Sequence, residues 1–163
     1  MREIPELLAW FNTALATAVF PFVARVYGVD ASKLRVIDAF LVKYDAAKQR
    51  SLPLHCDQSE YSITLPLNSQ NDYDGGGTYF HSIARAVNAQ AGGLVAFPGH
   101  LTHGASQITR GRRYVIVAFL YEYKDANDTD RDDLDDDRKC PKPDQDADDT
   151  DEDTDEAEDA PAP

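Results

Sequence analysis

The octapeptide Tyr61-Ser62-Ile63-Thr64-Leu65-Pro66-Leu67-Asn68 carries the pattern that decides the fold class. Its odd-numbered positions are all apolar or aromatic, whereas Ser62 and Thr64 between them are small and polar. Because successive side chains of a β-strand point to opposite faces, this alternation predicts a strand with one buried face. Proline cannot donate a hydrogen bond to a neighbouring strand, so Pro66 predicts an edge strand or a bulge.

Further strand signals lie on both sides of this octapeptide. Mixed apolar residues at 36–44, short runs at 78–80 and 94–97, and a continuous apolar run at 114–123 predict four more strands. The continuous run is typical of a central strand. The glycine-rich segment 71–77 reads as a hairpin turn between strands. The chain therefore has the signals of a mainly β protein.

A helix is predicted before the strands. Apolar residues recur at helical spacing over residues 4–26, which indicates an amphipathic helix. A proline inside a helix removes a backbone hydrogen bond, so Pro21 predicts a bend or an end there. One helix followed by many short strands favours a β-sandwich or barrel with a bracing helix.

The acidic charge of the chain is concentrated at its C-terminal end. Residues 124–163 hold 19 of the 29 acidic and 5 of the 16 basic residues, a formal charge of −14, whereas residues 1–123 carry +1. The tail has no aromatic residue and one leucine, so it cannot bury enough apolar surface to offset the cost of ordering its backbone. We expect a folded domain at 1–123 and a disordered acidic tail at 124–163. The tail could contact a basic partner, and the body lacks the basic surplus typical of nucleic-acid binding.

The cellular compartment is only weakly indicated. Cys56 and Cys140, the only cysteines, argue against a disulfide framework and mildly for a reducing compartment. Residues 7–18 contain small-residue patterns of a signal peptide, but acidic residues stand where positive charge is expected. The apolar run is short and contains Pro21, which argues against a membrane span. We expect an intracellular, cytoplasmic protein, with secretion as the alternative.

Two side chains of metal-ligating type lie two residues apart in His55-Cys56-Asp57. If residues 53–57 are extended, His55 and Asp57 project to one face and Cys56 to the other. Alone, this pair is a weak signal, because a histidine near an aspartate is more often a surface or core pair. A third ligand is available in the segment 97–104, Phe97-Pro98-Gly99-His100-Leu101-Thr102-His103-Gly104, where His100 and His103 compete for the role.

Two histidines and one carboxylate form the ligand set that holds a non-haem Fe(II) and leaves the opposite positions open. Arg113 opens the last predicted strand, with Val115 and Val117 on its face. A planar guanidinium among apolar neighbours is suited to bidentate recognition of a carboxylate, which suggests a carboxylate co-substrate. The alternative is an ordinary strand-edge arginine. The Tyr44 hydroxyl could hydrogen-bond the same carboxylate, with packing as its alternative role.

Together these segments resemble the prolyl 4-hydroxylase-type Fe(II)/2-oxoglutarate dioxygenases, and within them the lysyl hydroxylase catalytic domain. The resemblance runs from about residue 36 to residue 123. Its motifs appear in the family's order and spacing. They are Tyr44, His55-x-Asp57, Asp74-Gly75-Gly76-Gly77-Thr78-Tyr79-Phe80, Phe97-Pro98-Gly99, His103-Gly104 and Thr109-Arg110-Gly111-Arg112-Arg113-Tyr114.

The resemblance implies a double-stranded β-helix, or jelly roll, in which His55, Asp57 and His103 bind iron. The distance from His103 to Arg113 matches the family, which favours His103 over His100. By the same resemblance Arg113 pairs with the distal carboxylate of 2-oxoglutarate, Tyr44 assists it, and L-ascorbate keeps the iron reduced.

The activity implied is hydroxylation of a C–H bond, with release of succinate and CO2. The substrate would be a prolyl or lysyl residue of a peptide or protein, or a small molecule. Two alternatives stand beside this hypothesis. One is a non-catalytic metal-binding jelly-roll module whose acidic tail recruits a partner, and the other is a cupin-like metalloenzyme that does not use 2-oxoglutarate.

Overall fold

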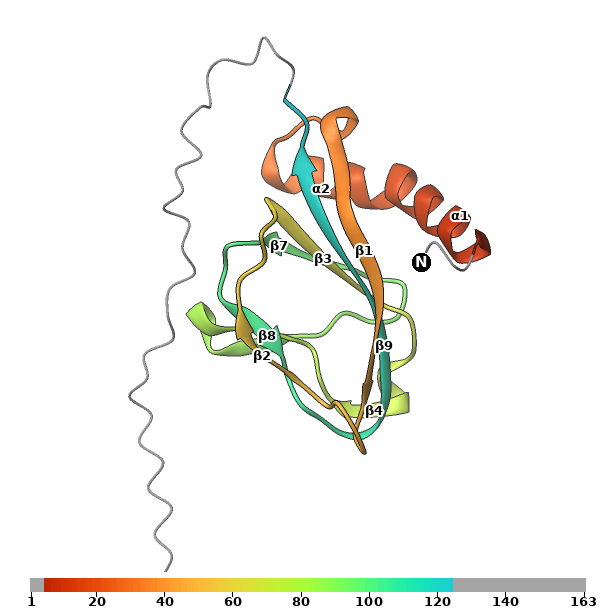
Figure 1. Ribbon diagram of the computed structural model, residues 1–163, viewed down its shortest axis with the longest axis vertical. Coiled ribbons are helices and arrows are strands. Elements are labelled where there is room, and N and C mark those ends of the chain that lie inside the picture. Colours follow the sequence, from red (N-terminus) through yellow and green to blue (C-terminus); the bar gives the residue numbers. More distant parts are fainter. Residues whose placement is uncertain (1–4, 125–163) are drawn as a thin grey trace, which may run out of the picture.

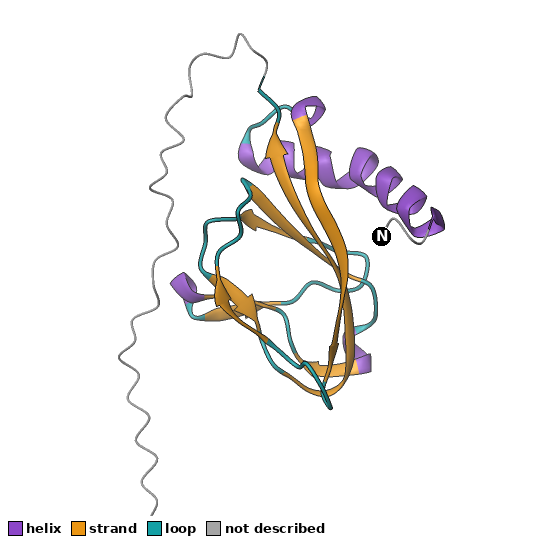
Figure 2. Cartoon of the chain, in the orientation of Figure 1, coloured by secondary structure: helices purple, strands orange, loops and turns teal. Residues whose placement is uncertain are grey.

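The computed structural model describes residues 5–124 of the 163-residue chain. A helical segment is followed by two antiparallel β-sheets, and the helix lies across the outside of one of them (Figure 1, Figure 2). This arrangement confirms the prediction of a mainly β protein with an N-terminal bracing helix. Apart from Lys124, the predicted acidic tail lies outside the described residues.

The N-terminal helical segment runs through Pro21 instead of ending there. It consists of α1 (Pro5–Ala14), a π-helical turn (Leu15–Val19) and α2 (Phe20–Tyr27). In the π-helical turn the Phe20 N–H donates to the Leu15 carbonyl, five residues back. Pro21 then stands in the first turn of α2, where a proline is tolerated. The helix ends at Gly28, whose left-handed φ of 72° is typical of a glycine cap.

The first sheet, here called the long sheet, contains the two longest strands. Its order is β1 (Leu34–Asp45), β9 (Ile108–Glu122), β3 (Tyr61–Pro66) and β7 (Val95–Pro98), and β4 (Tyr73–Gly75) pairs separately with β9. Because β9 pairs with both β1 and β3, the predicted central position of this apolar run is confirmed.

The second sheet, here called the short sheet, has the order β2 (Leu52–His55), β8 (His103–Ala105), β5 (Thr78–Phe80) and β6 (Arg85–Val87). Strands of three residues, such as β4, β6 and β8, are too short to show a period, and the sequence did not predict them. A 3-10 turn at Ala31–Lys33 leads from α2 to β1, and two more at Gln70–Asp72 and His81–Ile83 lie between strands.

Strand β3 differs in two ways from its prediction. It is an interior strand between β9 and β7 and its register has no shift, so the prediction of an edge strand or a bulge is wrong. Pro66 is tolerated because it is the last residue of the strand and pairs only with β9. The strand is also buried on both faces: Ser62 and Thr64, expected to face solvent, are 0% and 8% exposed. Their face points toward the second sheet, as the 3.5 Å separation of the Thr64 and Thr78 hydroxyls shows.

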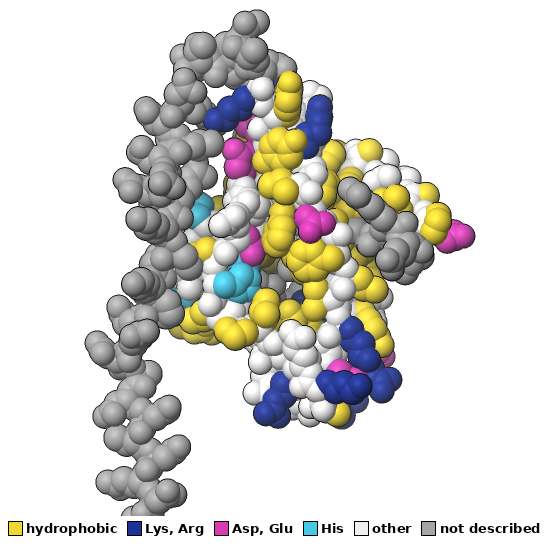
Figure 3. Space-filling view, in the orientation of Figure 1, with side chains coloured by type: hydrophobic (Ala, Val, Ile, Leu, Met, Phe, Trp, Pro, Cys, Tyr) yellow, Lys and Arg dark blue, Asp and Glu magenta, His cyan; other side chains and the backbone are white. Residues whose placement is uncertain are grey.

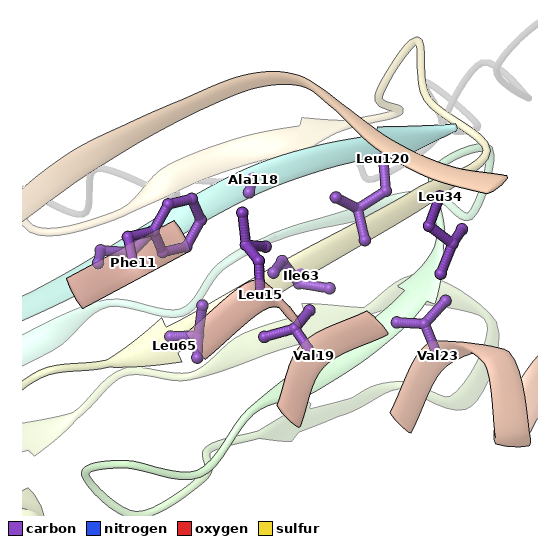
Figure 4. Close-up of a cluster of buried hydrophobic side chains, with 10 residues drawn as sticks. Phe11, Leu15, Val19, Val23, Leu34, Ile63, Leu65, Ala118 and Leu120 are labelled. Carbon is purple, nitrogen blue, oxygen red and sulfur yellow. The ribbon is translucent and has the colours of Figure 1, made fainter. Parts of the chain in front are cut away.

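The main hydrophobic core lies between the helical segment and the outer face of the long sheet (Figure 4). By length and composition Pro5–Tyr27 would also suffice to cross a membrane, a property that core helices and signal sequences share. The helix packs one apolar side on the sheet, and the inner face of the sheet is left for the cavity described below. The buried members of this core are Phe11, Leu15, Val19, Val23, Leu34, Ile63, Leu65, Ile116, Ala118 and Leu120.

Candidate metal centre

Three side chains of metal-ligating type converge where β2 meets β8. His55 ends β2 and His103 begins β8, and the two residues are register partners in the short sheet. Asp57 follows two residues after His55, beyond the end of the strand. Its Oδ1 lies 3.4 Å from His55 Nε2 and its Oδ2 lies 3.3 Å from His103 Nε2. All three ligand atoms lie within 4.8 Å of one another, close enough to share one ion.

Backbone carbonyls fix the tautomer of both imidazoles. His55 Nδ1 lies 2.8 Å from the Pro53 carbonyl, and His103 Nδ1 lies 2.7 Å from the Leu101 carbonyl. A carbonyl oxygen can only accept a hydrogen bond, so each Nδ1 carries the proton and donates it. The Nε2 of each neutral imidazole then keeps a lone pair that can bind an ion shared with Asp57. Metal-bound histidines are commonly oriented in this way, so the donor set fits a divalent metal.

Hydrogen bonds to its side chain and from its backbone hold Asp57 in place. The Ser62 hydroxyl donates to Oδ2 at 2.5 Å, and the Asp57 backbone N–H donates to the Gly99 carbonyl. Burial acts to raise the pKa of Asp57. The hydrogen bond and charge of His103 when its imidazole is protonated, the Ser62 hydrogen bond and the charge of a protonated His55 outweigh burial, and the pKa is lowered. Asp57 is therefore ionised at neutral pH, as a metal ligand must be.

A cavity of about 240 Å³ opens beside these ligands, between the two sheets. Apart from the three metal-ligating side chains and Arg113, its wall is apolar or uncharged. The space-filling view shows hydrophobic side chains following the exposed edge of the long sheet beside a hollow (Figure 3). The lining residues are Phe40, Val42, Tyr44, Gln49, Leu52, His55, Asp57, Thr64, Thr78, Phe97, His103, Gly104, Ala105, Arg113, Val115, Val117 and Phe119.

Arg113 is a buried cation in the wall of this cavity. It is 3% exposed, and its Nε has no hydrogen-bond partner among the described residues. Its register partner across β1 and β9 is Tyr44, whose ring centroid lies 5.6 Å from the guanidinium carbon. Burial raises the pKa of the Tyr44 hydroxyl, against the opposing effect of the Arg113 charge. A buried guanidinium with an unused donor is suited to bind an anion.

All five residues expected at the site line one cavity. His55, Asp57 and His103 lie together. Arg113 and Tyr44 lie on the paired strands β9 and β1 of the long sheet. Val115 and Val117 share the face of Arg113, as the alternation of β9 predicts. His100, the competing histidine, is exposed and lies outside this cluster.

Three polar residues of the cavity region were missed. Ser62 binds Asp57, and Thr64 and Thr78 line the cavity. The alternation along β3 showed a polar face, but this face was expected to contact solvent and not a buried site. Cys56 lies outside the ligand cluster, and its Sγ is 3.6 Å from the Thr102 hydroxyl. Cys140 lies outside the described residues.

Two facing antiparallel sheets with a His-Asp-His cluster between them define the class of jelly-roll, or double-stranded β-helix, metalloproteins. A solved structure supports this fold. An oxidoreductase of the 2OG-Fe(II) oxygenase family from Burkholderia pseudomallei superposes with a TM-score of 0.60 at 16% sequence identity, covering 77% of this chain and 60% of that one. No protein-family model matches the chain.

Curated relatives identify the group within this class. The chain is 33% identical over 124 residues to procollagen-lysine,2-oxoglutarate 5-dioxygenase 1 of Gallus gallus, and 33% identical over 124 residues to the Homo sapiens protein of that name. It is 34% identical over 111 residues to the procollagen lysyl hydroxylase and glycosyltransferase of Acanthamoeba polyphaga mimivirus. The chain is thus a homologue of the lysyl hydroxylases, which confirms the resemblance found in the sequence.

The similarity covers a small part of each relative. The matches to the chicken and human proteins include 74% of this chain and 17% of theirs, and the viral match includes 63% and 12%. The activity and substrates of those whole proteins therefore enter only as a proposal.

Proposed function

We propose that this chain is an Fe(II)- and 2-oxoglutarate-dependent dioxygenase that hydroxylates a C–H bond and releases succinate and CO2. The observation that carries the proposal is the buried Arg113, which faces the same cavity as His55, Asp57 and His103. A metal cluster alone would fit many jelly-roll proteins. A metal cluster beside a buried cation with an unused donor fits a reaction in which a carboxylate co-substrate binds next to the metal.

In this proposal His55, Asp57 and His103 hold the iron. When bound, Fe(II) supplies the redox chemistry by which dioxygen oxidises 2-oxoglutarate and hydroxylates the substrate. The protein contributes position and environment. Ser62 keeps the Asp57 carboxylate oriented, Arg113 pairs with the distal carboxylate of the co-substrate, and we propose that the hydroxyl of Tyr44, whose ring lies beside the guanidinium, donates to the same group.

The cavity wall has a second role. Its aromatic and aliphatic side chains, among them Phe40, Val117 and Phe119, exclude water from the space between metal and co-substrate. A low local dielectric strengthens the pairing of Arg113 with a carboxylate. Both effects favour binding of a small dianion that reaches from the guanidinium to the metal.

The substrate is proposed by analogy with the relatives. Their names describe procollagen lysine as the group acted on, and we propose a peptide or protein substrate with a lysyl or prolyl target. L-ascorbate is proposed as the reductant that maintains Fe(II). We also propose that the acidic segment 124–163 contacts a basic partner and that the protein is intracellular.

An anaerobic titration of the purified chain with Fe(II) and then 2-oxoglutarate tests the proposal directly. A metal-to-ligand charge-transfer band is expected when both are present, and no band at any ratio would remove the assignment. His103→Ala should abolish both the band and succinate formation. His100→Ala is the matched control, since this histidine is exposed and outside the cluster, and it should behave like the unmodified chain.

A further inference from the structure

Gly75 ends β4, and Gly76 and Gly77 lead from it to β5. Because β4 pairs with β9 and β5 pairs with β6 and β8, the prediction of a hairpin turn here is wrong. Gly75, Gly76 and Gly77 have positive φ angles of 80°, 76° and 104°. The outer two are restricted mainly by backbone. A Cβ on Gly75 would collide with the Gln107 carbonyl oxygen, and one on Gly77 would lie 3.0 Å from the Val87 carbonyl oxygen. The middle glycine is different because side chains surround it.

Gly76 lies against the aliphatic stem of Arg113. A Cβ at this position would lie 3.2 Å from Arg113 Cδ and 3.0 Å from Ile108 Cγ2, with Tyr73 Cε2 at 3.4 Å. Contacts of 3.0 to 3.4 Å are tighter than most real Cβ contacts, so a neighbour must move.

The surroundings determine which neighbour moves. Ile108 and Tyr73 are 0% and 2% exposed and belong to one packed cluster. The Gly76 N–H donates to the Gln107 carbonyl at 3.0 Å, which holds the loop backbone in place. Arg113 has a flexible side chain that lines a cavity, and its Nε has no partner among the described residues. It is therefore the group that an added methyl would displace.

We infer that Gly76 is a positioning residue for the co-substrate. Because Gly76 has no side chain, the Arg113 stem can lie against it, and this sets how far the guanidinium reaches toward the metal ligands. The inference rests on the proposed function, because it assumes that Arg113 binds the distal carboxylate of 2-oxoglutarate. It assigns to the glycine triplet a role beyond that of a turn.

The test compares Gly76→Ala with Gly92→Ala. Gly92 also has a left-handed φ, 81°, but nothing lies within 4 Å of the position that an alanine methyl would take there, so the control carries the same backbone strain without the contact. Gly76→Ala should weaken 2-oxoglutarate binding to the Fe(II)-loaded chain, by less than the roughly hundredfold that a misplacement of about 1 Å can cost, because the neighbour must give by a few tenths of an ångström. The KM for 2-oxoglutarate should rise more than kcat falls. Fe(II) affinity should be unchanged in both variants, and Gly92→Ala should keep the original KM.

A second measurement needs no co-substrate. In a double-mutant cycle on unfolding stability, Gly76→Ala should be less destabilising in an Arg113→Ala background, because Cδ is no longer there to be displaced. Independent effects in this cycle, or a Gly76→Ala chain that binds 2-oxoglutarate as tightly as the Gly92→Ala control, would overturn the inference. Failure of the unmodified chain to bind 2-oxoglutarate would instead overturn the proposed function, and this inference with it.

Discussion

Replacing Arg113 by leucine should separate recognition of the co-substrate from stability of the fold. The guanidinium is 3% exposed, its Nε is unpartnered among the described residues, and Val115 and Val117 share its face. Removing one partner of a buried, hydrogen-bonded charge pair costs about 2 to 5 kcal/mol, which corresponds to roughly 30- to 4000-fold in affinity. We therefore expect the KM for 2-oxoglutarate to rise by a factor in that range.

The same substitution should not lower the unfolding free energy. Exchanging a buried, unpaired cation for an apolar side chain of similar size is often neutral or stabilising, because the charge no longer has to be kept out of water. The Arg113→Leu chain should thus melt no lower than the unmodified chain. Succinate formation at varied 2-oxoglutarate concentration measures the first effect, and urea unfolding without co-substrate measures the second.

The neighbouring Arg112 offers the control. It lies on the opposite face of β9, is exposed, and bonds Asp45 through Nε at 3.0 Å. Arg112→Leu should leave the KM for 2-oxoglutarate unchanged, since this side chain does not line the cavity. An unchanged KM in Arg113→Leu would refute the assignment of the co-substrate site. A large loss of stability in Arg113→Leu would show that the arginine serves the fold instead.

Three further predictions concern other parts of the molecule. Ser62→Ala removes the donor to Asp57 Oδ2 and should weaken Fe(II) binding by about 10- to 100-fold, measured by metal titration, while the fold persists. Tyr44→Phe removes one hydrogen bond to the co-substrate, worth about 0.5 to 1.5 kcal/mol, and should raise the KM for 2-oxoglutarate roughly two- to thirteenfold. Leu15→Ala leaves a hole between helix and sheet and should lower the unfolding free energy by about 2 to 5 kcal/mol, measured by urea denaturation.

The site could be predicted well because its residues carry their chemistry in the sequence. The spacing of His55 and Asp57 and the position of Arg113 before an apolar run were visible without coordinates, although β9 begins at Ile108 and Arg113 lies inside it instead of opening it. The choice of His103 over His100 rested on the family resemblance alone, since either histidine could follow a Pro-Gly turn. Geometry separates them: His103 pairs in register with His55, whereas His100 is exposed. Their roles as ligands stay predictions until metal is bound.

The fold class was likewise predictable, but the details of β3 were not. Alternation shows that a strand has two unlike faces, and it does not show what covers each face. The small polar face of β3 was assigned to solvent, yet Ser62 is fully buried and serves the metal centre. Pro66 was placed at an edge because the sequence cannot show that only one neighbouring strand extends that far.

The two faces of β3 serve different purposes, one in the hydrophobic core and the other at the candidate site. Ile63 and Leu65 face the helix, and Ser62 and Thr64 face the cavity. Substitutions on one face can therefore adjust stability while the chemistry is left alone, and the reverse holds for the other face. Insertion of one residue would exchange the faces, placing hydroxyls under the helix and aliphatic side chains beside the metal. Strand β3 should thus tolerate substitutions far more readily than insertions or deletions.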